Sequence, residues 1–417
     1  MSRLAELIKE LCPDGVEYRP LGAIADLQRG GGMPKKLFVD KGIPAIHYGH
    51  IFTKYGIQTT CAVAYLTSED ADKLTRVYPG DLVVANTSEN LEDVGKGVVW
   101  LGDVEGVTGG HATVVRSLTV DTVFLSYYLR TEDFALKKRK YAQGTKVIEL
   151  SAVNLSKIDI PIPPMEVQRE IVRILDQFTT LESELESELE ARRAQYEHYR
   201  NHLLSYDSLA SRGPVEMVTL GAIATRVVTG VTPQASNSRY YQDGSNPWIR
   251  TQDVNFNRIS EASEFVTDHA IDELPLKWVK ANSVIVAISG ASAGRSAILG
   301  IDAVTNQHCC NLEIDSNCAE YRYVYYSLAA RYADLRSLGR GARGDLNVSI
   351  IKSFEIPLPE IEQQRAVADL LDRFDSLVND ISSGLPAEIA ARRAQYEHYR
   401  DRLLSFPEKA VSGSVAS

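Results

Sequence analysis

The sequence has few of the residues and none of the long apolar runs that would mark a secreted, metal-binding or membrane protein. Only five of its 417 residues are cysteine, and their spacing fits neither a zinc site nor a disulfide framework. No run of about twenty apolar residues is present to cross a membrane, and the first residues lack the apolar core of a signal peptide. We therefore expect a cytoplasmic protein with reduced thiols, no metal site and no membrane association.

Catalytic signatures are absent as well. Gly95-Lys96-Gly97 lacks the rest of the P-loop frame, and the glycine-rich stretch 290–294 lacks the acidic residue that dinucleotide-binding motifs place downstream. Asn246-Pro247-Trp248 lacks the second proline of the Asn-Pro-Pro-Tyr loop of adenine methyltransferases. The eight histidines and the scattered carboxylates form no recognisable nucleophile set. None of these motifs therefore predicts a catalytic site or a cofactor.

The chain also lacks an excess of positive charge, since its formal net charge is −10. Residues 20–160 carry sixteen basic and sixteen acidic side chains, and residues 219–359 carry thirteen and fourteen. Residues 161–206 and 360–406 each hold nine acids, against five and six bases. The acidity therefore lies mostly in these two stretches. The near-neutral remainder can still bind nucleic acid if its basic residues gather on one face.

What the sequence does contain is an internal repeat. The ten residues 191–200 return unchanged at 391–400, which indicates one unit built twice. Other matched segments are 20–25 with 219–224, 160–163 with 356–359, 168–169 with 364–365, and 175–178 with 371–374. Between them, residues 30–140 and 230–335 show little similarity to one another. The repeat predicts a shared frame that carries two different surfaces.

Each half reads as a globular body followed by a long helix. Apolar residues recur at steps of three and four along both helical stretches, including Leu185 in the first and Leu377 in the second. A narrow apolar stripe on so long a helix predicts that the two helices pair as a coiled coil. Because proline breaks helical hydrogen bonding, we expect a kink or a break at Gly384-Leu385-Pro386. The predicted segments are 1–165 (first body with an N-terminal helix), 166–206 (central helix), 207–218 (linker), 219–359 (second body), 360–406 (C-terminal helix) and 407–417 (tail).

These features resemble one known family. The opening Leu7-Ile8-Lys9-Glu10-Leu11-Cys12-Pro13-Asp14-Gly15-Val16-Glu17-Tyr18 and the following Pro20-Leu21-Gly22 look like the start of a type I restriction-modification specificity subunit. Two divergent bodies, each ending in Ile-Pro-(Ile/Leu)-Pro and a Gln-Arg helix, fit the same family. The resemblance implies a mixed α/β fold with two target-recognition domains, separated by two long antiparallel helices. It also implies double-stranded DNA as the ligand, two modification (methyltransferase) subunits and restriction subunits as partners, and no catalytic role.

Four loops in each half are candidates for DNA contact, because they combine glycine turns with side chains that bind phosphates or read base edges. The candidate residues are Arg29, Lys35, Lys36, His47, Tyr48, His50, Asn86, Lys96 and Lys146 in the first half, and Thr232, Arg250, Gln252, Asn255, Ser292, Arg295, Arg340 and Arg343 in the second. The basic run 137–140 is either another phosphate contact or only a solvated helix end. Any single basic loop residue is more commonly just solvated surface.

The repeated ten residues are candidates for subunit docking, because tyrosine and arginine are favoured at interface centres. These residues are Arg192, Arg193, Tyr196 and Tyr199, with their copies Arg392, Arg393, Tyr396 and Tyr399. The alternative is that the motif only seals the coiled coil, since tyrosine on an apolar stripe is often core. For the whole chain, the alternatives are a stand-alone DNA methyltransferase or nuclease, and a coiled-coil scaffold whose bodies bind proteins.

Overall fold

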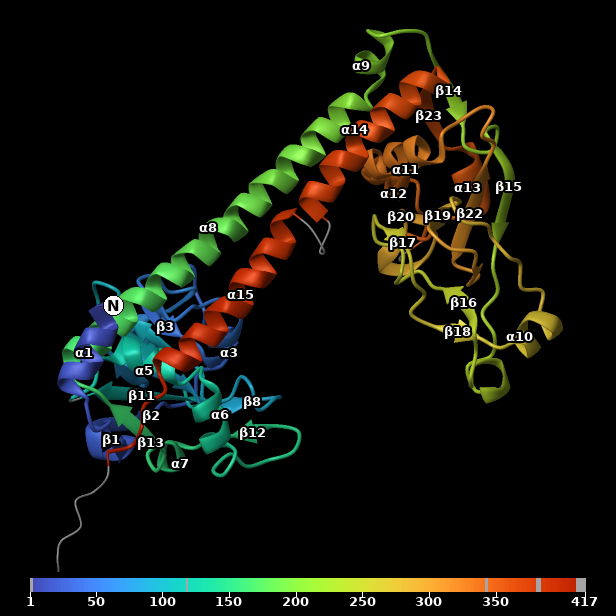
Figure 1. Cartoon of the computed structure of the whole chain (residues 1–417). Helices are drawn as coiled ribbons and strands as arrows, with labels where there is room; N and C mark the ends of the chain where they lie inside the picture. Colours follow the sequence, from blue (N-terminus) through green and yellow to red (C-terminus); the bar gives the residue numbers. More distant parts are fainter. Residues whose placement is uncertain (1–2, 118, 342–343, 380–383, 410–417) are drawn as a thin grey trace, which may run out of the picture. The chain divides into compact units, whose positions relative to one another are not determined.

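A computed structural model describes residues 3–117, 119–341, 344–379 and 384–409. The chain forms two compact units, drawn with their element labels in Figure 1. Unit 1 comprises residues 1–185 and 389–417, and unit 2 comprises residues 186–388. Helix α8 (Met165–Leu203) runs unbroken through the boundary, so each unit includes one part of it. Within the described residues, no helix is both long and apolar enough to span a membrane.

Unit 1 contains two principal sheets. The larger has the strand order β2-β11-β7-β9-β4, and the smaller has the order β5-β3-β10-β6. Pairing is antiparallel except between β4 and β9 and between β3 and β10. The strands are β2 (Ala25–Arg29), β3 (Ile43–Ile46), β4 (Gln58–Thr59), β5 (Ala64–Leu66), β6 (Thr75–Val77), β7 (Leu82–Ala85), β9 (Gly97–Trp100), β10 (Gly106–Thr108) and β11 (Ala112–Ser117). Strand β7 is buried along its whole length, as its run of valines predicts for a strand covered on both faces.

Helices cover one face of the larger sheet in unit 1. The Asp121 carboxylate caps α5 (Thr122–Tyr128) by accepting from the amides of Val123 and Phe124. Helix α6 (Glu132–Lys138) follows it, and Thr131 caps that helix. The core joins side chains from the sheet and α5 to Ile171 and Leu175 of α8. The remaining helices of this unit are α1 (Arg3–Leu11), α2 (Leu21–Ile24), α3 (Tyr48–Thr53), α4 (Ser68–Ala71) and α7 (Ala152–Leu155).

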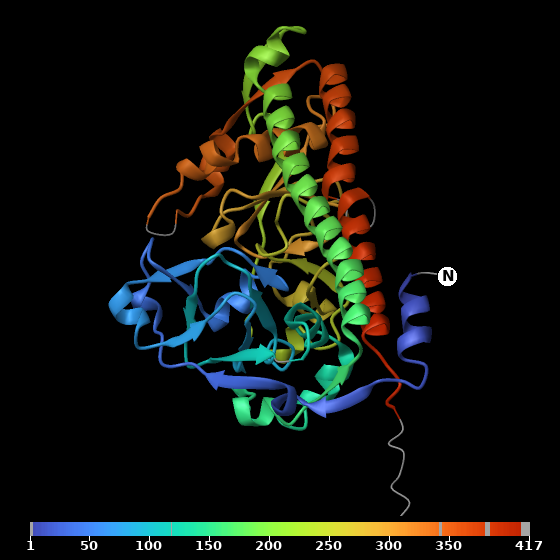
Figure 2. The same cartoon turned by 90° about the vertical axis from the view of Figure 1, so that its left-hand side faces the viewer.

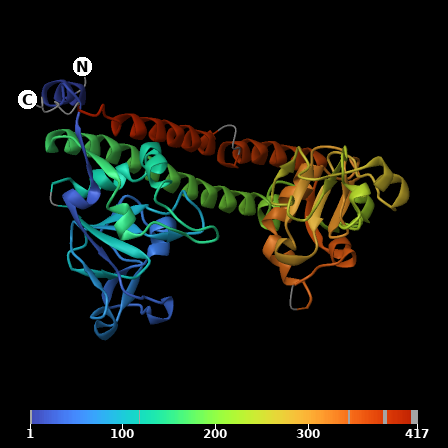
Figure 3. The same cartoon turned by 90° about the horizontal axis from the view of Figure 1, so that it is seen from below.

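The last helix, α15 (Gly384–Leu403), returns to complete unit 1 from residue 389 onward. It packs antiparallel to α8: Phe178 stacks on Tyr399 at 5.7 Å between ring centroids, and Glu182 accepts from Arg393 at 2.7 Å. The segment after α15 then joins the segment after α1, because the amide of Val16 donates to the carbonyl of Pro407. Figures 2 and 3 show α1 beside this terminal segment.

Unit 2 repeats this topology with a different sequence. Its larger sheet has the order β15-β22-β19-β20-β17, which matches β2-β11-β7-β9-β4 strand for strand, and its smaller sheet has the order β18-β16-β21. The strands are β15 (Ala224–Thr229), β16 (Asn246–Ile249), β17 (Arg258–Ile259), β18 (Phe265–Val266), β19 (Val284–Ala287), β20 (Ser296–Leu299), β21 (Val304–Thr305) and β22 (Cys309–Ile314). The two bodies that look unrelated in sequence are thus two copies of one mixed α/β fold.

The helices of unit 2 also follow the repeat. Helix α11 (Tyr321–Ala330) corresponds to α5, α12 (Tyr332–Ser337) to α6, and α13 (Val348–Ser353) to α7. The end of α8 contributes Tyr196 to the core of this unit, together with Leu371 and Val378 of α14 (Ile361–Asn379). Two further helices are α9 (Tyr206–Ala210), within the stretch expected to be a linker, and α10 (Asp268–Glu273).

The matched sequence segments form the joints between bodies and long helices. The buried Gln168 amide accepts from the amide of Asp121 at 2.8 Å and donates to the carbonyl of Pro163 at 2.6 Å. Gln364 makes the same two bonds, with Glu320 and Pro359, at 2.9 and 2.7 Å. The Ile-Pro segments lie in β13 (Asp159–Ile162) and β23 (Glu355–Pro359), which pair antiparallel with β1 (Glu17–Pro20) and β14 (Val215–Thr219).

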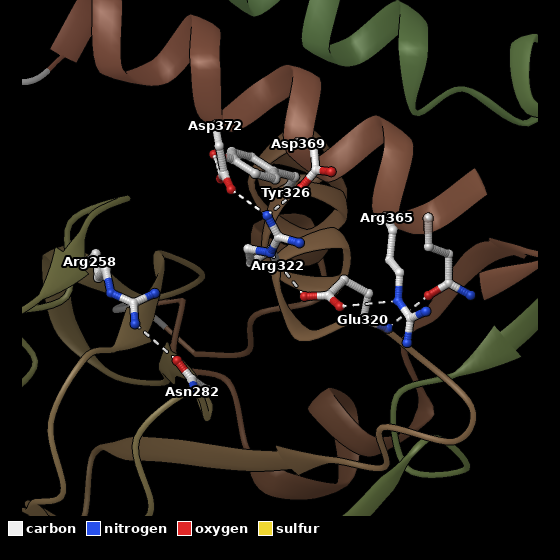
Figure 4. Close-up of polar contacts among 9 residues, drawn as sticks. Arg258, Asn282, Glu320, Arg322, Tyr326, Arg365, Asp369 and Asp372 are labelled. Carbon is white, nitrogen blue, oxygen red and sulfur yellow. Dashed lines mark hydrogen bonds and ion pairs between the residues drawn. The ribbon is translucent and has the colours of Figure 1, made fainter. Parts of the chain in front are cut away.

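A second pair of equivalent bonds and one added network reinforce these joints. The hydroxyl of Tyr127 donates to Asp176, and the hydroxyl of Tyr326 donates to Asp372. Only in unit 2 does an arginine join them: Arg322 pairs with Glu320 and with both Asp369 and Asp372 of α14 (Figure 4). Val123 occupies the corresponding position of α5. The two bodies therefore use one joint, with extra charge pairing in the second.

The C-terminal helical stretch 360–406, for which a kink or a break was expected at Gly384-Leu385-Pro386, is described as two helices, α14 and α15. Residues 380–383 lie outside the described part of the chain. Pro386 lies in the first turn of α15, where a missing amide hydrogen costs no helical bond. The expected apolar stripe is also shifted by one residue, since Val378 is buried whereas Leu377 is 60% exposed.

The shift gives a matched test of helix packing in unit 2. Val378→Asp places a carboxylate inside the core, and we expect it to lower the free energy of unfolding by about 3 kcal/mol or more. Leu377→Asp, the adjacent control, should change it by less than about 1 kcal/mol because that side chain already meets solvent. Urea unfolding followed by circular dichroism measures both, and equal losses would contradict the packing described.

Candidate nucleic-acid interface

The first pair of candidate loops follows β2 and β15. Arg29 is the last residue of β2, and its guanidinium pairs with Glu149 at 2.9 Å. Lys35 and Lys36 open a short 3-10 helix, η1 (Lys35–Leu37), and both are exposed. In unit 2, Thr232 is exposed, and its hydroxyl bonds to Gln307. Of the candidate basic residues in this pair of loops, Lys35 and Lys36 are thus the ones whose side chains extend into solvent.

The glycines of these loops have a structural role. A Cβ on Gly30 would lie 2.1 Å from the carbonyl oxygen of Gly109, and a Cβ on Gly230 would lie 1.7 Å from that of Thr305. Real Cβ atoms essentially never come within 3.0 Å of another heavy atom. Each glycine therefore lets two backbone segments of its own body approach. The structure shows no opening for a phosphate at these two Cα positions.

The second loop of unit 1 builds an aromatic cluster. His47 caps α3, and its Nδ1 accepts from the amide of Gly49 at 3.1 Å. Its ring lies 4.5 Å from that of Tyr48 and 5.3 Å from that of His50. The ring of Tyr48 lies 4.9 Å from that of His111, which is exposed. Burial first, and then the nearby His50, Lys35 and His111, lower the pKa of His47 to about 4, so the ring is neutral at physiological pH.

The second loop of unit 2 carries the richest set of base-reading side chain types. Gln252 and Asn255 are exposed. Arg250 is held back in the body, since it pairs with Glu264 at 3.3 Å and lies over the ring of Trp248. Asn255 accepts a hydrogen bond from Arg295 at 2.9 Å. An amide that is exposed and already oriented by an arginine is well placed for a bidentate contact with adenine.

The third pair of loops contains residues that serve the fold. Asn86 is fully buried, and its Oδ1 accepts from Thr113 at 2.9 Å. Lys96 pairs with Asp93 at 2.6 Å and is only partly exposed. Ser292 is half-buried at the end of η3 (Gly290–Ser292), a short 3-10 helix that follows β19. A buried asparagine cannot reach a base, so the choice of Asn86 as a DNA contact does not fit this structure.

The fourth pair of loops is exposed. Lys146 and Arg340 both extend into solvent, whereas Arg343 lies outside the described residues. In the nearby run 137–140, Arg139 and Lys140 are exposed, whereas Lys137 and Lys138 bond to the rest of the body. The buried Lys138 donates to the carbonyls of Glu92 and Val94, and Lys137 pairs with Asp133 at 2.8 Å. Burial lowers the pKa of Lys138 to about 8.

Contacts within each unit bring its candidate loops together. In unit 1, the ion pair between Arg29 and Glu149 links the first loop to the fourth. The pairing of two short strands, β8 (Thr87–Ser88) and β12 (Ile148–Glu149), links the third loop to the fourth. His111 contacts both Tyr48 and Thr87, so the second loop joins them. In unit 2, Asn255 with Arg295 and Ser289 with Asp345 make the corresponding links. Each body thus gathers loops from distant parts of the sequence into one surface.

The repeated ten residues divide between core and surface. Tyr196 and Tyr396 are buried, and each lies under an arginine, Arg200 or Arg400, with the guanidinium carbon 5.7 Å from the ring centroid in both copies. Tyr199 and Tyr399 are exposed, as are the side chains of Arg192, Arg193, Arg392 and Arg393. The alternative that the motif seals the helix packing therefore applies to the two buried tyrosines. Docking stays a prediction for the exposed members.

Sequence reasoning missed the side chains that fix each body on its helix. Gln168 and Gln364 stood in the matched segments, but nothing in the sequence gave their bonding partners. Arg130 was not singled out either, although it is largely buried in unit 1. The repeat itself could have identified the two glutamines as structural residues. Polar residues that recur inside two apolar helical faces are expected to bond to equivalent partners.

Comparisons with known proteins identify this architecture. The family model described as type I restriction modification DNA specificity domain matches residues 13–191 and again residues 213–391. The EcoR124I/EcoR124II specificity subunit of Escherichia coli is 34% identical over 270 residues, 62% of this chain and 65% of that protein. A putative type I restriction enzyme specificity subunit of Haemophilus influenzae is 27% identical over 420 residues, 94% of this chain and 96% of that protein.

Solved structures agree on the fold. A chain from a structural study of type I restriction-modification complex assembly aligns with a TM-score of 0.62 at 17% identity, over 94% of this chain and 97% of that one. The S subunit of a type I restriction-modification system from M. genitalium aligns with a TM-score of 0.51 at 15% identity, over 94% and 96%. The chain thus shares the fold of these two proteins.

The chain belongs to the type I restriction modification DNA specificity family and carries two copies of its domain. It is a specificity subunit, a DNA-recognition component with no catalytic role of its own. The resemblance inferred from the sequence is confirmed. The comparisons give no support to a stand-alone methyltransferase or nuclease, or to a protein-binding scaffold.

The neutral His47 predicts an acid-sensitive first body. In the unfolded chain a histidine takes up a proton near pH 6.5, whereas folded His47 does so only near pH 4. Stability is therefore fully present above pH 6.5 and is lost as the pH falls toward 4, by about 2 kcal/mol at pH 5. His47→Asn keeps a helix-capping side chain and should flatten this dependence. Urea unfolding at pH 5 and pH 8 measures it, and an unchanged slope in the variant would refute the assignment.

Proposed function

We propose that each of the two domains reads one half of an asymmetric, bipartite site in double-stranded DNA, within a cytoplasmic type I restriction-modification complex. The observation that carries the proposal is that the two bodies share one topology but present different side chains on equivalent loops. One fold with two loop sets suits two half-sites of different sequence. The recognition domains are residues 1–165 and 219–359, with 166–206 and 360–406 as spacer, 207–218 as linker and 407–417 as tail.

Within each surface, the roles follow from exposure and chemistry. Lys35, Lys36 and Lys146 in the first domain and Arg340 in the second are exposed cations suited to phosphates. Tyr48 and His50 in the first, with Gln252 and Asn255 in the second, are candidates for base contacts. Other candidates lie in the same loops as His50 and these residues: Arg29, Lys96, Thr232, Arg250, Ser292 and Arg295. Some of them have intramolecular partners that DNA would have to displace or share, namely Arg29, Lys96, Arg250 and Arg295. His47 acts through the loop that it caps.

The long helices set the gap between the half-sites in this proposal. Helix α8 has 39 residues, and at about 1.5 Å per residue it is about 60 Å long. The DNA helix repeats every 34–36 Å, so a spacer of fixed length selects half-sites on a matching face of the duplex. A change in helix length should therefore alter the gap before it alters the bases read.

The exposed faces of the helices would bind two modification subunits, and restriction subunits through the complex. In unit 2, Arg192, Tyr199, Phe374 and Leu377 line a groove of about 580 Å³. Tyr199 is 48% exposed and Leu377 60%. Large apolar side chains exposed together are typical of protein interfaces. The corresponding exposed residues in unit 1 are Tyr399, Arg392 and Arg393.

Exchange of one domain tests the independence of the two readers. Replacing residues 219–359 by the second recognition domain of a relative should change one half of the methylated motif and leave the other half and the gap unchanged. Methylome sequencing of a host with and without the gene gives the reference motif. A change in both halves would contradict independent reading, and a motif that persists without the gene would refute the proposed function.

Salt dependence tests the phosphate contacts. Each phosphate contact contributes about −0.9 to the slope of log K against log salt concentration. Replacing both Lys35 and Lys36 by alanine in the assembled complex should therefore make the slope shallower by about 1 to 2, with the recognised bases unchanged. Lys9→Ala, on an exposed face of α1, is the matched control. An unaltered slope in the double variant would remove these lysines from the interface.

A further inference from the structure

The repeat places an open cleft in unit 2 where unit 1 holds a partly buried arginine, Arg130. The equivalence follows from matched bonds. The Gln168 and Gln364 joints align Asp121 with Glu320, so Arg130 corresponds to Ala329 nine residues further along. The Tyr127–Asp176 and Tyr326–Asp372 bonds align the long helices, so Thr179 corresponds to Asp375.

The floor of the cleft is aligned in the same way. The amide of Val99 donates to the carbonyl of Ile57 in unit 1, and the amide of Ile298 donates to that of Asn257 in unit 2. Gly56 therefore corresponds to Phe256. Ala329 thus takes the place of Arg130, Phe256 takes the place of Gly56, and both line the cleft in unit 2.

In unit 1 the guanidinium of Arg130 fills this space. It donates to the carbonyl of Gly56 at 2.6 Å and approaches that of Gly97 at 3.4 Å. Burial lowers the pKa of Arg130, and the charge of Arg400 lowers it further, whereas Tyr396 raises it. The fold therefore accepts a guanidinium at this point even beside a second arginine.

In unit 2, Ala329 replaces the arginine, and Asp375 replaces Thr179, so the space holds no guanidinium and gains a carboxylate. The cleft has a volume of about 670 Å³, and aromatic side chains from three elements line it, including Tyr196, Tyr325 and Tyr332. Asp375 contributes a carboxylate that accepts from Asn379 at 2.9 Å. Burial raises the pKa of this carboxyl group, because its charge is poorly solvated. A bound cation would relieve that cost.

Most of the remaining charges of the two sites come from the repeated ten residues. Arg193, Glu197 and Arg200 line the cleft in unit 2, and Arg393, Glu397 and Arg400 are their copies. Against this shared background, unit 2 has lost a positive charge at Ala329 and gained a negative charge at Asp375. It also has Val378 where unit 1 has Glu182, which pairs with Arg393. The site in unit 2 is therefore more negative by one charge. Its cleft is thus electrostatically better suited to a cation than the site in which Arg130 already lies.

We propose that this cleft binds the guanidinium group of an arginine side chain presented by a partner protein. A carboxylate and the faces of aromatic rings, both present in the cleft, are groups that recognise a planar guanidinium better than a lysine ammonium. The chain itself provides the precedent, since in unit 1 the same space is filled by an arginine carried on polypeptide.

Binding of N-acetyl-arginine amide to the full chain, measured by isothermal titration calorimetry, tests the proposal. We expect saturable binding at one site, at least tenfold tighter than that of N-acetyl-norleucine amide. Asp375→Asn should weaken it at least tenfold, and A329R should abolish it by filling the cleft as Arg130 does. A329Q is a neutral filling variant that keeps the test valid if A329R does not fold. No saturable binding, or equal affinity in the folded variants, would overturn the proposal.

Transplanting the site provides the reverse test. The double variant R130A/T179D should open an equivalent cleft in unit 1 and raise the stoichiometry from one to two. A stoichiometry that stays at one in the folded variant would contradict the equivalence. Agmatine distinguishes the source of the guanidinium: if it saturates the cleft whereas N-acetyl-arginine amide does not, the ligand is a small molecule and the partner-protein proposal fails.

Discussion

A pair of buried amide hydrogen bonds at the start of each long helix determines where each recognition body sits on that helix. Gln168 and Gln364 each satisfy one backbone donor of the body and one backbone acceptor of the strand that enters the helix. Unpaired, those buried backbone groups would cost about 1–3 kcal/mol each. The loops of a body can face DNA in a defined direction only if the body is fixed, so recognition depends on a contact remote from the recognising surface.

The long helices and the internal repeat could be predicted from the sequence, whereas the common topology of the two bodies could not. Helical periodicity over forty residues and an unchanged ten-residue repeat are local signals, and both survive in α8 and α15. The common topology of the two bodies is not local. It depends on which short strands pair, and central strands such as β7 and β9, which are buried on both faces, tolerate many apolar sequences. Residues 30–140 and 230–335 therefore diverged without changing the sheet order.

The recognition surface was predictable as a set of loops and less so as individual residues. A polar side chain in a loop looks the same in sequence whether it faces solvent or holds the loop together. His47 caps a helix, Asn86 bonds to a neighbouring strand, and Lys138 bonds to two carbonyls. Gly30 was similarly ambiguous, because a glycine in a loop can admit either a phosphate or another backbone segment. In the structure, a neighbouring backbone segment lies against Gly30. Burial decides these cases, and burial is a property of the pairing of distant strands.

The bond between Val16 and Pro407 implies an order of assembly during synthesis. Unit 2 lies within one continuous stretch, residues 186–388, so it can fold once that stretch has left the ribosome. The core of unit 1 includes Tyr396, Leu404 and Phe406, so it stays incomplete until the last helix emerges. The body translated first is thus completed last, and its exposed apolar surface must be protected for nearly the whole time of translation.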